Sequence, residues 1–354
     1  MPLKVGLTYN LKRQPTADKG LPEDFYAEFD DEETVDAIAE ALRKGGCKVT
    51  KIEADKKAYE NLRRLKPDIV FNIAEGLNGE SRESHIPTIL EMLSIPYTGS
   101  GPLTLALSLN KALTHQILLC NGIPSPFFQV FTRAEERIPK KLGFPLVVKP
   151  LLEGSSKGVR SSSLVRDEKS LRRQVSWIIN TYNQPAIVEE FLPGREFTVG
   201  LIGNGKPVVL PIVEIFLDKL PSGASPLYSY EAKWIWDVPE KPLDIFRCPA
   251  DIPQKLEREI RHIAIKTFRV LNCRDVCRID MRLDKNNKPR VLEVNPLPGL
   301  IPNPDAHSCL PEAARAAGFT YEQLICTILW LALKRYNLQH LFENRSLINF
   351  HDIS

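Results

Sequence analysis

The feature that most constrains the fold of this sequence is the stretch RIDMRLDKNNKPRVLEVN, residues 278–295. Because side chains alternate between the two faces of a strand, its first half predicts a strand with Arg278, Asp280 and Arg282 on one face and apolar residues on the other. The turn DKNNKP then predicts a returning strand. On this second strand we expect one face to carry Val291, Glu293 and Asn295, and the opposite face Leu292 and Val294.

The polar face of this hairpin suits a metal and phosphate site. If the polar faces of both strands coincide, Asp280, Glu293 and Asn295 converge as three oxygen donors. Mg²⁺ takes oxygen ligands, and ATP-using sites commonly hold it with one or two carboxylates plus phosphate oxygens. Arg278 lies on the same face, where it would stabilise negative charge on a reacting oxygen. A solvated hairpin face is the plainer alternative, but the rigid turn NPLPG after Asn295 favours an edge that faces a ligand.

A second stretch, LVVKPLLEGSSKGV at residues 146–159, combines a lysine with a loop of small residues. The apolar strand ends near Lys149, and Gly154, Ser155, Ser156 and Gly158 follow. Small residues let backbone N–H groups approach phosphate oxygens closely, while the lysine supplies a positive charge. A plain turn after a strand is the alternative. The stretch matches neither the Walker A nor the dinucleotide-binding pattern, which argues against a P-loop enzyme and a Rossmann oxidoreductase.

A third stretch, AIVEEFLPGREFTV at residues 186–199, has acidic side chains at the end of an apolar strand. Glu189 and Glu190 precede Phe191, Leu192 and a Pro-Gly turn. Backbone groups of such a segment can hydrogen-bond the edge of an adenine ring, and an acidic side chain such as Glu196 can hold ribose hydroxyls. Taken alone, an acidic pair at a strand end is more often solvated surface.

Around these stretches, short apolar runs alternate with helical patterns, which is typical of an α/β fold. Strands are expected at KVGLTY, CKVTKIE and DIVFNIAE, and a helix at HIPTILEMLSI. Further helices are expected from Asp30 to Lys44, Asn110 to Gly122, Pro253 to Asn272 and Tyr321 to Arg335. The stretch from Pro221 to Pro242 is aromatic and lacks periodicity, which favours a functional loop.

Length and composition limit the classes of protein that this chain can be. Its 354 residues are enough for two or three domains. The 47 basic and 44 acidic residues leave a charge of +3, too weak to indicate nucleic acid or a membrane surface as partner. No apolar run reaches transmembrane length, no secretory signal opens the chain, and the seven cysteines lack zinc-site spacing. We therefore expect a cytoplasmic protein with reduced thiols and a small-molecule partner.

Several motifs, in one order, resemble those of the ATP-grasp ligases. The order is Lys111, Lys149, the Ser/Gly loop, EEFLPGREF, YEAKW and the hairpin pattern D…E-x-N. Within that superfamily, the phrases IPYTGSGPLTLALSLNK, EGSSKGV, YSYEAKW, CRIDMRLD and LEVNPLPG are similar to signatures of the D-alanine–D-alanine ligase family. The resemblance covers residues 66–335.

The resemblance implies an ATP-grasp fold of the α/β class. It implies an amino-terminal α/β domain at residues 1–101 and a small lobe at 102–200 with the phosphate loop and the adenine strand. A large lobe would follow at 201–342 with the lid loop and the metal hairpin, and a tail at 343–354.

The resemblance also implies roles for individual residues. ATP would be contacted by Lys111, Lys149, Ser155, Ser156, Glu189, Glu190, Phe191, Leu192 and Glu196. One or two Mg²⁺ ions, with Mn²⁺ as an alternative, would be held by Asp280, Glu293 and Asn295. The catalytic residues would be Arg278, Lys233, Ser155 and Glu28, with Lys233 at the transferred phosphate and Arg278 at the tetrahedral intermediate. The substrates would meet Arg278, Gly299, Ser308 and Trp234, with Ser308 at the carboxylate of the second amino acid.

The sequence departs from the family pattern where the substrates would lie. In place of S-x-E-R-x-V-S it has NLKRQPTADKGLPEDFYAEFDDEET, where Glu28 is the nearest candidate to hold the first amino acid's ammonium group and Asp30 is its rival. NIAEGLNGESRES replaces H-G-x-x-G-E-D-G, so Glu75 and Glu80 remain but the histidine is lost. Trp234 replaces a tyrosine and cannot accept a hydrogen bond through its ring nitrogen. These changes predict a first substrate other than D-alanine. The alternatives are that Trp234 closes the lid by packing and that other groups bind the same D-alanine.

The function that the resemblance implies is an ADP-forming carboxylate–amine ligase, which makes a peptide bond through an acyl phosphate. Its substrates would be amino acids or peptides, and no nucleic-acid or membrane partner is expected. A ligase for a different amino acid or natural-product carboxylate is an alternative, as are a non-catalytic nucleotide-binding protein and a kinase that phosphorylates a hydroxyl. Retention of Arg278 and the metal-ligand candidates argues against a mere binder. A homodimer is left open.

Overall fold

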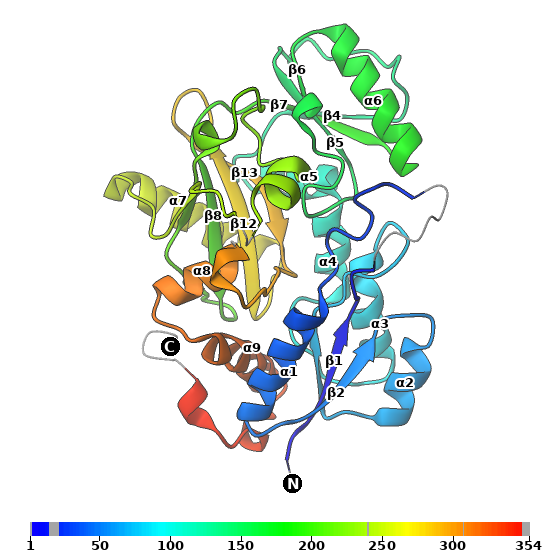
Figure 1. Cartoon of the computed structure of the whole chain (residues 1–354), viewed down its shortest axis with the longest axis vertical. Coiled ribbons are helices and arrows are strands. Elements are labelled where there is room, and N and C mark those ends of the chain that lie inside the picture. Colours follow the sequence, from blue (N-terminus) through cyan, green and yellow to red (C-terminus); the bar gives the residue numbers. More distant parts are fainter. Residues whose placement is uncertain (1, 14–20, 239–240, 307, 349–354) are drawn as a thin grey trace.

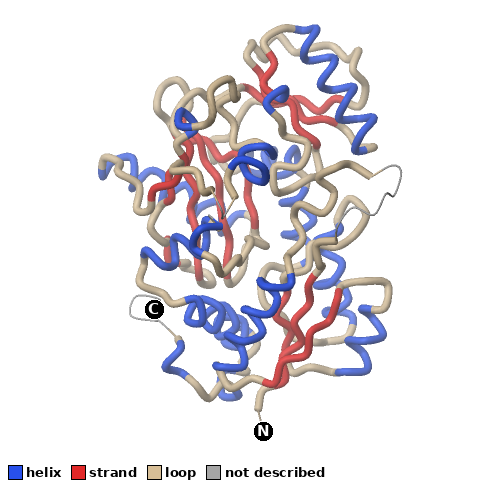
Figure 2. The backbone as a smooth tube through the Cα atoms, in the orientation of Figure 1, coloured by secondary structure: helices blue, strands red, loops and turns tan. Residues whose placement is uncertain are grey.

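The computed structural model describes residues 2–13, 21–238, 241–306 and 308–348 of the chain. Within these ranges the strands form three separate sheets with helices packed against them (Figure 1). Figure 2 shows that long loops run between the sheets near the middle of the molecule. The mixture of helix and sheet agrees with the predicted α/β class.

The amino-terminal sheet is parallel and has the strand order β2-β1-β3. It consists of β1 (Lys4–Tyr9), β2 (Lys48–Glu53) and β3 (Ile69–Asn72), with helices α1 (Glu32–Lys44), α2 (Ala58–Leu65) and α3 (His85–Met92). The side chain of Asp31 caps α1 by accepting a hydrogen bond from the Thr34 N–H at 2.7 Å. The predicted helix start at Asp30 is therefore wrong, and Asp30 instead lines a cavity.

Two helices, α4 (Pro102–Leu109) and α5 (Lys111–Cys120), lead to the second sheet. This sheet is antiparallel and contains, in spatial order, β4 (Phe128–Phe131), β7 (Ala186–Glu190), β5 (Leu146–Pro150) and β6 (Leu164–Val165). Helix α6 (Glu168–Tyr182) packs its apolar face on the sheet. The sequence patterns above do not predict α6, although Asp167 and Ser170 form a capping box at its start.

The third sheet carries the predicted hairpin. Its spatial order is β11 (Phe246–Arg247), β10 (Val213–Ile215), β8 (Glu196–Ile202), β12 (Val276–Leu283) and β13 (Pro289–Asn295), and β9 (Val208–Val209) also pairs with β8. Helix α7 (Gln254–Val270) packs on one face of this sheet, and α8 (Cys309–Ala316) packs on the other. The sheet is thus covered on both sides, which explains why β8 is buried along its whole length.

The hairpin contains a β-bulge that the sequence does not reveal. Asp280 pairs with Glu293, but the next residue, Met281, pairs with Val291, so Leu292 is the extra residue. Val291 consequently lies in the apolar core, while Leu292 lines the cavity with Glu293. The predictions that Val291 shares a face with Glu293 and that Leu292 lies opposite are therefore wrong, because strict alternation does not hold across a bulge.

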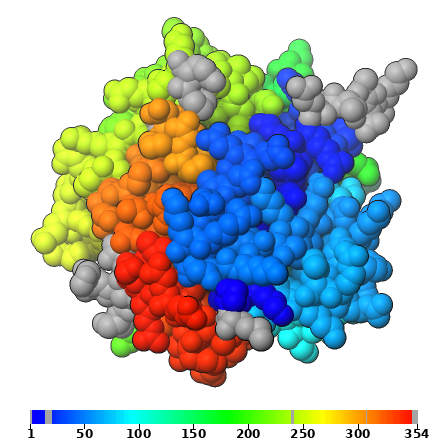
Figure 3. All heavy atoms as spheres, turned by 60° about the horizontal axis from the view of Figure 1, so that its bottom comes forward, coloured from blue at the N-terminus to red at the C-terminus, as the bar shows by residue number. Residues whose placement is uncertain are grey.

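The carboxyl-terminal part of the chain packs against the amino-terminal sheet. Helix α9 (Tyr321–Arg335) shares one apolar core with α1 and β1. Figure 3 shows carboxyl-terminal residues in red beside amino-terminal residues in blue on one face. The expected boundary at residue 200 falls inside β8, so we propose that the small lobe ends before Glu196. Of the expected tail, residues 349–354 lie outside the described residues.

Short 3₁₀ helices connect these elements, at Arg82–Ser84, Ser161–Ser163, Leu217–Lys219, Pro304–Ala306, Gln339–Leu341 and Arg345–Leu347. In the part of the chain that the structure describes, no single helix is long and apolar enough to cross a membrane. Together α8 and α9 reach that length and composition, but the pair is bent by 102°.

Candidate functional site

A cavity of about 220 Å³ lies where the three sheets approach one another. Its lining residues come from many segments of the chain, the first being Ala27 near α1 and the last Cys309 at the start of α8. All the predicted site residues share this cavity: Glu28, Lys111, Lys149, Ser155, Ser156, Glu189, Glu190, Phe191, Leu192, Glu196, Lys233, Trp234, Arg278, Asp280, Glu293, Asn295, Gly299 and Ser308. Their individual roles remain predictions.

The bulged hairpin places the candidate metal ligands together. Asp280 and Glu293 are direct neighbours across β12 and β13, and Asn295 pairs with Arg278 one step further along. The Arg278 guanidinium donates two hydrogen bonds to Asp280, at 3.1 and 2.9 Å, and Lys111 forms an ion pair with Glu293 at 3.1 Å. Burial alone would raise the pKa of Glu293, but the charges of Lys111 and Arg278 hold it below its usual value. The Glu293 carboxylate is therefore held in its charged form, which can bind a cation.

The loop after β5 has an unusual backbone geometry. Ser155 and Ser156 have positive φ angles of 51° and 61°, a conformation that is uncommon for residues other than glycine and that clusters at functional sites. A Cβ atom on Gly154 would lie 3.1 Å from a carboxylate oxygen of Glu28, so the loop and the amino-terminal segment approach closely there. Lys111 reaches into this loop and donates to the backbone carbonyl of Glu153.

Lys149 is held by a buried polar chain rather than by solvent. Its ammonium group donates to Glu189 at 2.7 Å, and the other oxygen of Glu189 contacts His115 Nε2 at 3.0 Å. His115 Nδ1 lies 2.5 Å from the hydroxyl of Ser125, which donates to the carbonyl of Val291. Burial would raise the pKa of Glu189, but Lys149 and His115 lower it to about 2. The Glu189 side chain therefore orients Lys149. Only the backbone groups of Glu189 remain available to hydrogen-bond an adenine ring.

His115 and Ser125 were not identified from the sequence, because neither belongs to a motif near the strand that they support. Their positions depend on α5 packing beside β7 and β13.

The remaining nucleotide-side candidates pack around Arg282. Glu196 and Arg282 form a buried ion pair at 3.3 Å, and the Arg282 guanidinium lies 4.9 Å from the centre of the Phe191 ring. Burial raises the pKa of Glu196 despite this partner. Glu190 instead accepts a hydrogen bond from the Phe127 N–H at 3.0 Å. Of the two acids, Glu196 is therefore the one whose side chain is placed to meet a polar group inside the cavity.

The expected lid loop, residues 221–242, contains a short π-helix at Ala232–Trp236, and its residues 239 and 240 lie outside the described residues. The Trp234 ring nitrogen donates to the Ser155 carbonyl at 3.1 Å, and this hydrogen bond joins the segment to the loop that contains Ser155 and Ser156. Among the described residues, the Lys233 ammonium has no hydrogen-bond or ion-pair partner. Burial and the charge of Arg278 lower its pKa. The positive charges of Lys233 and Arg278 would both stabilise an anion bound beside the Lys233 ammonium group.

The carboxyl-terminal side of the cavity contains Ser308, the residue before α8. Its hydroxyl donates to the Gly299 carbonyl at 3.2 Å, and it is 9% exposed. The neighbouring His307 of the motif AHSCLPEAA lies outside the described residues. Ser308, Gly299 and Arg278 line one cavity, as a carboxylate receptor requires.

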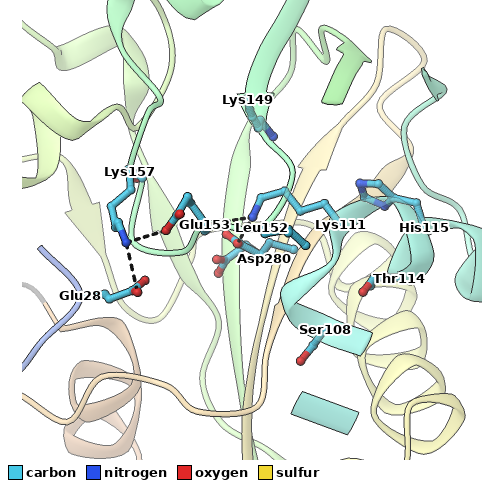
Figure 4. Close-up of polar contacts among 12 residues, drawn as sticks. Glu28, Ser108, Lys111, Thr114, His115, Lys149, Leu152, Glu153, Lys157 and Asp280 are labelled. Carbon is cyan, nitrogen blue, oxygen red and sulfur yellow. Dashed lines mark hydrogen bonds and ion pairs between the residues drawn. The ribbon is translucent and has the colours of Figure 1, made fainter. Parts of the chain in front are cut away.

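On the amino-terminal side, Glu28 is enclosed by cations. Arg82 donates to one oxygen of Glu28 at 2.7 and 3.0 Å, and Lys157 donates to the same oxygen at 3.2 Å. Glu153 completes the cluster, at 2.5 Å from Lys157 and 3.4 Å from Arg82. Figure 4 shows Lys157 bridging Glu28 and Glu153, with Lys111 beyond Glu153. Burial would raise the pKa of Glu28, but Arg82 and Lys157 hold it below its usual value.

Comparisons with known proteins agree with this geometry. Residues 118–330 match the family model described as D-ala D-ala ligase C-terminus. The D-alanine--D-alanine ligase of Pelotomaculum thermopropionicum is 34% identical over 316 residues, which cover 86% of this chain and 93% of that protein. An uncharacterized protein of Sinorhizobium fredii, y4sG, is 39% identical over 310 residues, 85% of this chain and 88% of that protein.

A solved structure supports the same fold. The crystal structure of D-alanine--D-alanine ligase from Bacillus anthracis complexed with ATP has a TM-score of 0.70 to this chain, at 23% identity. The match covers 95% of this chain and 99% of that chain.

Proposed function

This chain belongs to the D-alanine–D-alanine ligase family, and we propose that it joins an amino acid to a second amino acid or a peptide through an acyl phosphate made from ATP. It is an ATP-dependent ligase that forms carbon–nitrogen bonds, and the predicted ATP-grasp fold is confirmed. The observation that carries the proposal is that one cavity unites a phosphate loop, oxygen donors on a hairpin and a carboxylate receptor.

The hairpin end fits Mg²⁺, because Asp280, Glu293 and Asn295 are neighbouring oxygen donors and both carboxylates already attract cations. When bound, the ion would offset the negative charge of the phosphoryl group during transfer. Lys111, Lys149 and Lys233 would add positive charge around the phosphates from three different elements.

The second substrate would bind at the carboxyl-terminal side of the same cavity, beside the hairpin. Arg278 and Ser308 would hold its carboxylate, because a guanidinium beside a hydroxyl can donate several hydrogen bonds to one carboxylate. Arg278 would also stabilise the oxyanion that forms when the amine attacks the acyl phosphate. The segment around Lys233 and Trp234, fastened to Ser155, would exclude water from that intermediate.

We further propose that the first substrate is not restricted to D-alanine. The half of the cavity that would hold the first substrate lacks the family histidine. The Glu28 carboxylate there already forms ion pairs with Arg82 and Lys157. A site that hydrogen-bonds one specific group discriminates strongly, because the wrong ligand leaves buried polar groups unpaired. Replacing the polar groups of this half of the cavity is therefore expected to change which first substrate the protein selects.

A competition assay tests both statements. D-alanine is offered with other amino acids and ATP, ADP release is followed, and the products are identified by mass. Dominant D-alanyl-D-alanine at comparable concentrations would show that the departures do not alter specificity. Absence of turnover with every amino acid would instead favour a nucleotide-binding protein, and a stable phosphorylated product would favour a kinase.

A further inference from the structure

Helix α5 carries two basic side chains on one face, Lys111 and His115, which are four residues apart. Lys111 forms an ion pair with Glu293 on the hairpin, and His115 contacts Glu189 on β7. Figure 4 shows both basic side chains on this helix, with Lys149 on β5. One helix therefore contacts a carboxylate of the proposed metal site and the carboxylate that orients the proposed phosphate lysine.

His115 is the middle of a chain of buried hydrogen bonds. On one side its Nε2 contacts Glu189 at 3.0 Å, and Glu189 accepts from Lys149 at 2.7 Å. On the other side its Nδ1 contacts the Ser125 hydroxyl at 2.5 Å, which donates to the Val291 carbonyl at 3.0 Å. Because His115, Ser125 and Glu189 are almost completely buried, loss of one group would leave its neighbour unpaired in the protein interior.

The chain of hydrogen bonds ends at the β-bulge of the hairpin. Strand β13 is at the edge of its sheet, so the outward backbone groups of Val291 need partners from outside the sheet. The Val291 N–H donates to the Pro124 carbonyl at 2.9 Å, and the Val291 carbonyl accepts from Ser125. Pro124 and Ser125 belong to the loop after α5. This loop therefore holds β13 directly beside the bulge, two residues before Glu293.

The two ring nitrogens of His115 serve different ends of the chain. A carbonyl oxygen only accepts hydrogen bonds, so Ser125 gives its single hydroxyl proton to Val291 and accepts from Nδ1. The Glu189 carboxylate, whose pKa is lowered to about 2, also only accepts, and its donors are Nε2 and Lys149. One nitrogen therefore supports the hairpin and the other supports the lysine.

We propose that His115 and Ser125 are positioning residues that join the two halves of the phosphate-transfer site. Through Glu189 they fix the ammonium group of Lys149, and through the bulge they fix the end of the hairpin that carries Glu293. Outer partners of this kind orient the groups that contact a ligand directly. The inference rests on the proposed function, because that function assigns the ATP phosphates to Lys149 and Mg²⁺ to Glu293.

Two substitutions of His115 separate the two ends of the chain. In His115→Asn the amide can take the place of Nδ1, which keeps the contact with Ser125 and removes the contact with Glu189. In His115→Gln the amide can take the place of Nε2, which keeps Glu189 and removes Ser125. His262→Gln is the control, because His262 is an exposed histidine of α7 that does not line the main cavity.

Calorimetric titration with ATP in the absence of metal measures the lysine end. We expect the Kd for ATP to rise about 10-fold in His115→Asn, as the loss of a hydrogen bond to a charged group predicts. The Kd should change less than about threefold in His115→Gln and in the control His262→Gln.

Binding of Mn²⁺ in the presence of ADP, followed by electron paramagnetic resonance, measures the hairpin end. Here the order should reverse, with Mn²⁺ binding about 10-fold weaker in His115→Gln and in Ser125→Ala but within about threefold of wild type in His115→Asn. Adding Ser125→Ala to His115→Gln should weaken Mn²⁺ binding little further, because the same contact is already lost.

Equal changes in both binding constants for the two histidine variants would show that His115 only fills space, and they would overturn the assignment. Unchanged constants in both variants would do the same. If the histidine variants do not fold, Ser125→Ala decides, and wild-type Mn²⁺ binding in that variant would overturn the assignment. These measurements need no turnover, so they are separate from the ligation assay. Absence of ADP release from wild type would refute ligation alone, whereas a wild type that binds no ATP would refute both.

Discussion

Replacing Glu189 with glutamine is expected to destabilise the protein by about 3 kcal/mol at neutral pH. Glu189 is buried between Lys149 and His115, and their contacts lower its pKa from the ordinary 4.5 to about 2. At about 1.4 kcal/mol for each pH unit, this difference corresponds to about 3 kcal/mol of preference for the ionised carboxylate in the folded state. Glutamine keeps the shape but leaves the ammonium of Lys149 without its counter-charge.

The pH dependence of this effect has a definite sign. Because folding lowers the pKa of Glu189, its contribution is complete above 4.5 and is lost as the pH falls through about 2. The difference between wild type and Glu189→Gln should therefore be largest near neutral pH and should shrink between pH 4.5 and 2.

Urea unfolding followed by tryptophan fluorescence measures the free energy, and Glu190→Gln is the matched control. Glu190 is the next residue on the same strand, and its carboxylate accepts one hydrogen bond, from the Phe127 N–H. Glu189→Gln should also raise the KM for ATP, because Lys149 loses the group that orients it. Equal free energies of unfolding for the two variants at pH 7 would refute the reasoning.

Other predictions concern the remaining parts of the cavity. Glu293→Gln should leave the fold intact but remove most turnover, because an amide is a poorer magnesium ligand than a carboxylate. Near-normal turnover at ordinary magnesium concentration would show that Glu293 is not a metal ligand. Lys233→Ala should lower the ligation rate much more than ATP affinity, and equal losses in a paired rate and binding measurement would point to a general defect. Glu83, which faces Arg82, Glu28, Lys111 and Glu293, has its pKa raised to about 7, so its contribution to stability is lost as the pH rises from 4.5 through 7. Glu83→Gln should therefore melt at a higher temperature than wild type at pH 8 and at the same temperature below pH 4.5, and identical melting curves at pH 8 would contradict this.

The sequence predicts best where a local pattern determines the structure. The hairpin, the helix at Tyr321–Arg335 and the positions of Asp280 and Glu293 all follow from short-range periodicity. The bulge at Leu292 does not, because an extra residue leaves no distinct mark in an alternating strand.

Contacts between residues that are far apart in the chain could not be predicted from the sequence. Glu28 was placed near the substrates by resemblance, but its partners are 54 and 129 residues away in the chain. Only the folded arrangement of three separate loops shows that Arg82 and Lys157 neutralise it.

These partners connect the proposed first-substrate site to the proposed phosphate loop, residues 154–158. The segment that contains Glu28 also holds the loop through Asp24, which accepts hydrogen bonds from the Gly158 N–H at 2.8 Å and from the Tyr182 hydroxyl at 2.7 Å. Changing Glu28 alone would leave Arg82 and Lys157 with less counter-charge in a buried site and would disturb the loop that we propose binds the ATP phosphates. We therefore expect that substitutions at Glu28, Arg82 and Lys157 are tolerated only in combination. A substitution intended to restore D-alanine specificity at Glu28 should impair ATP binding unless Arg82 and Lys157 are replaced with it.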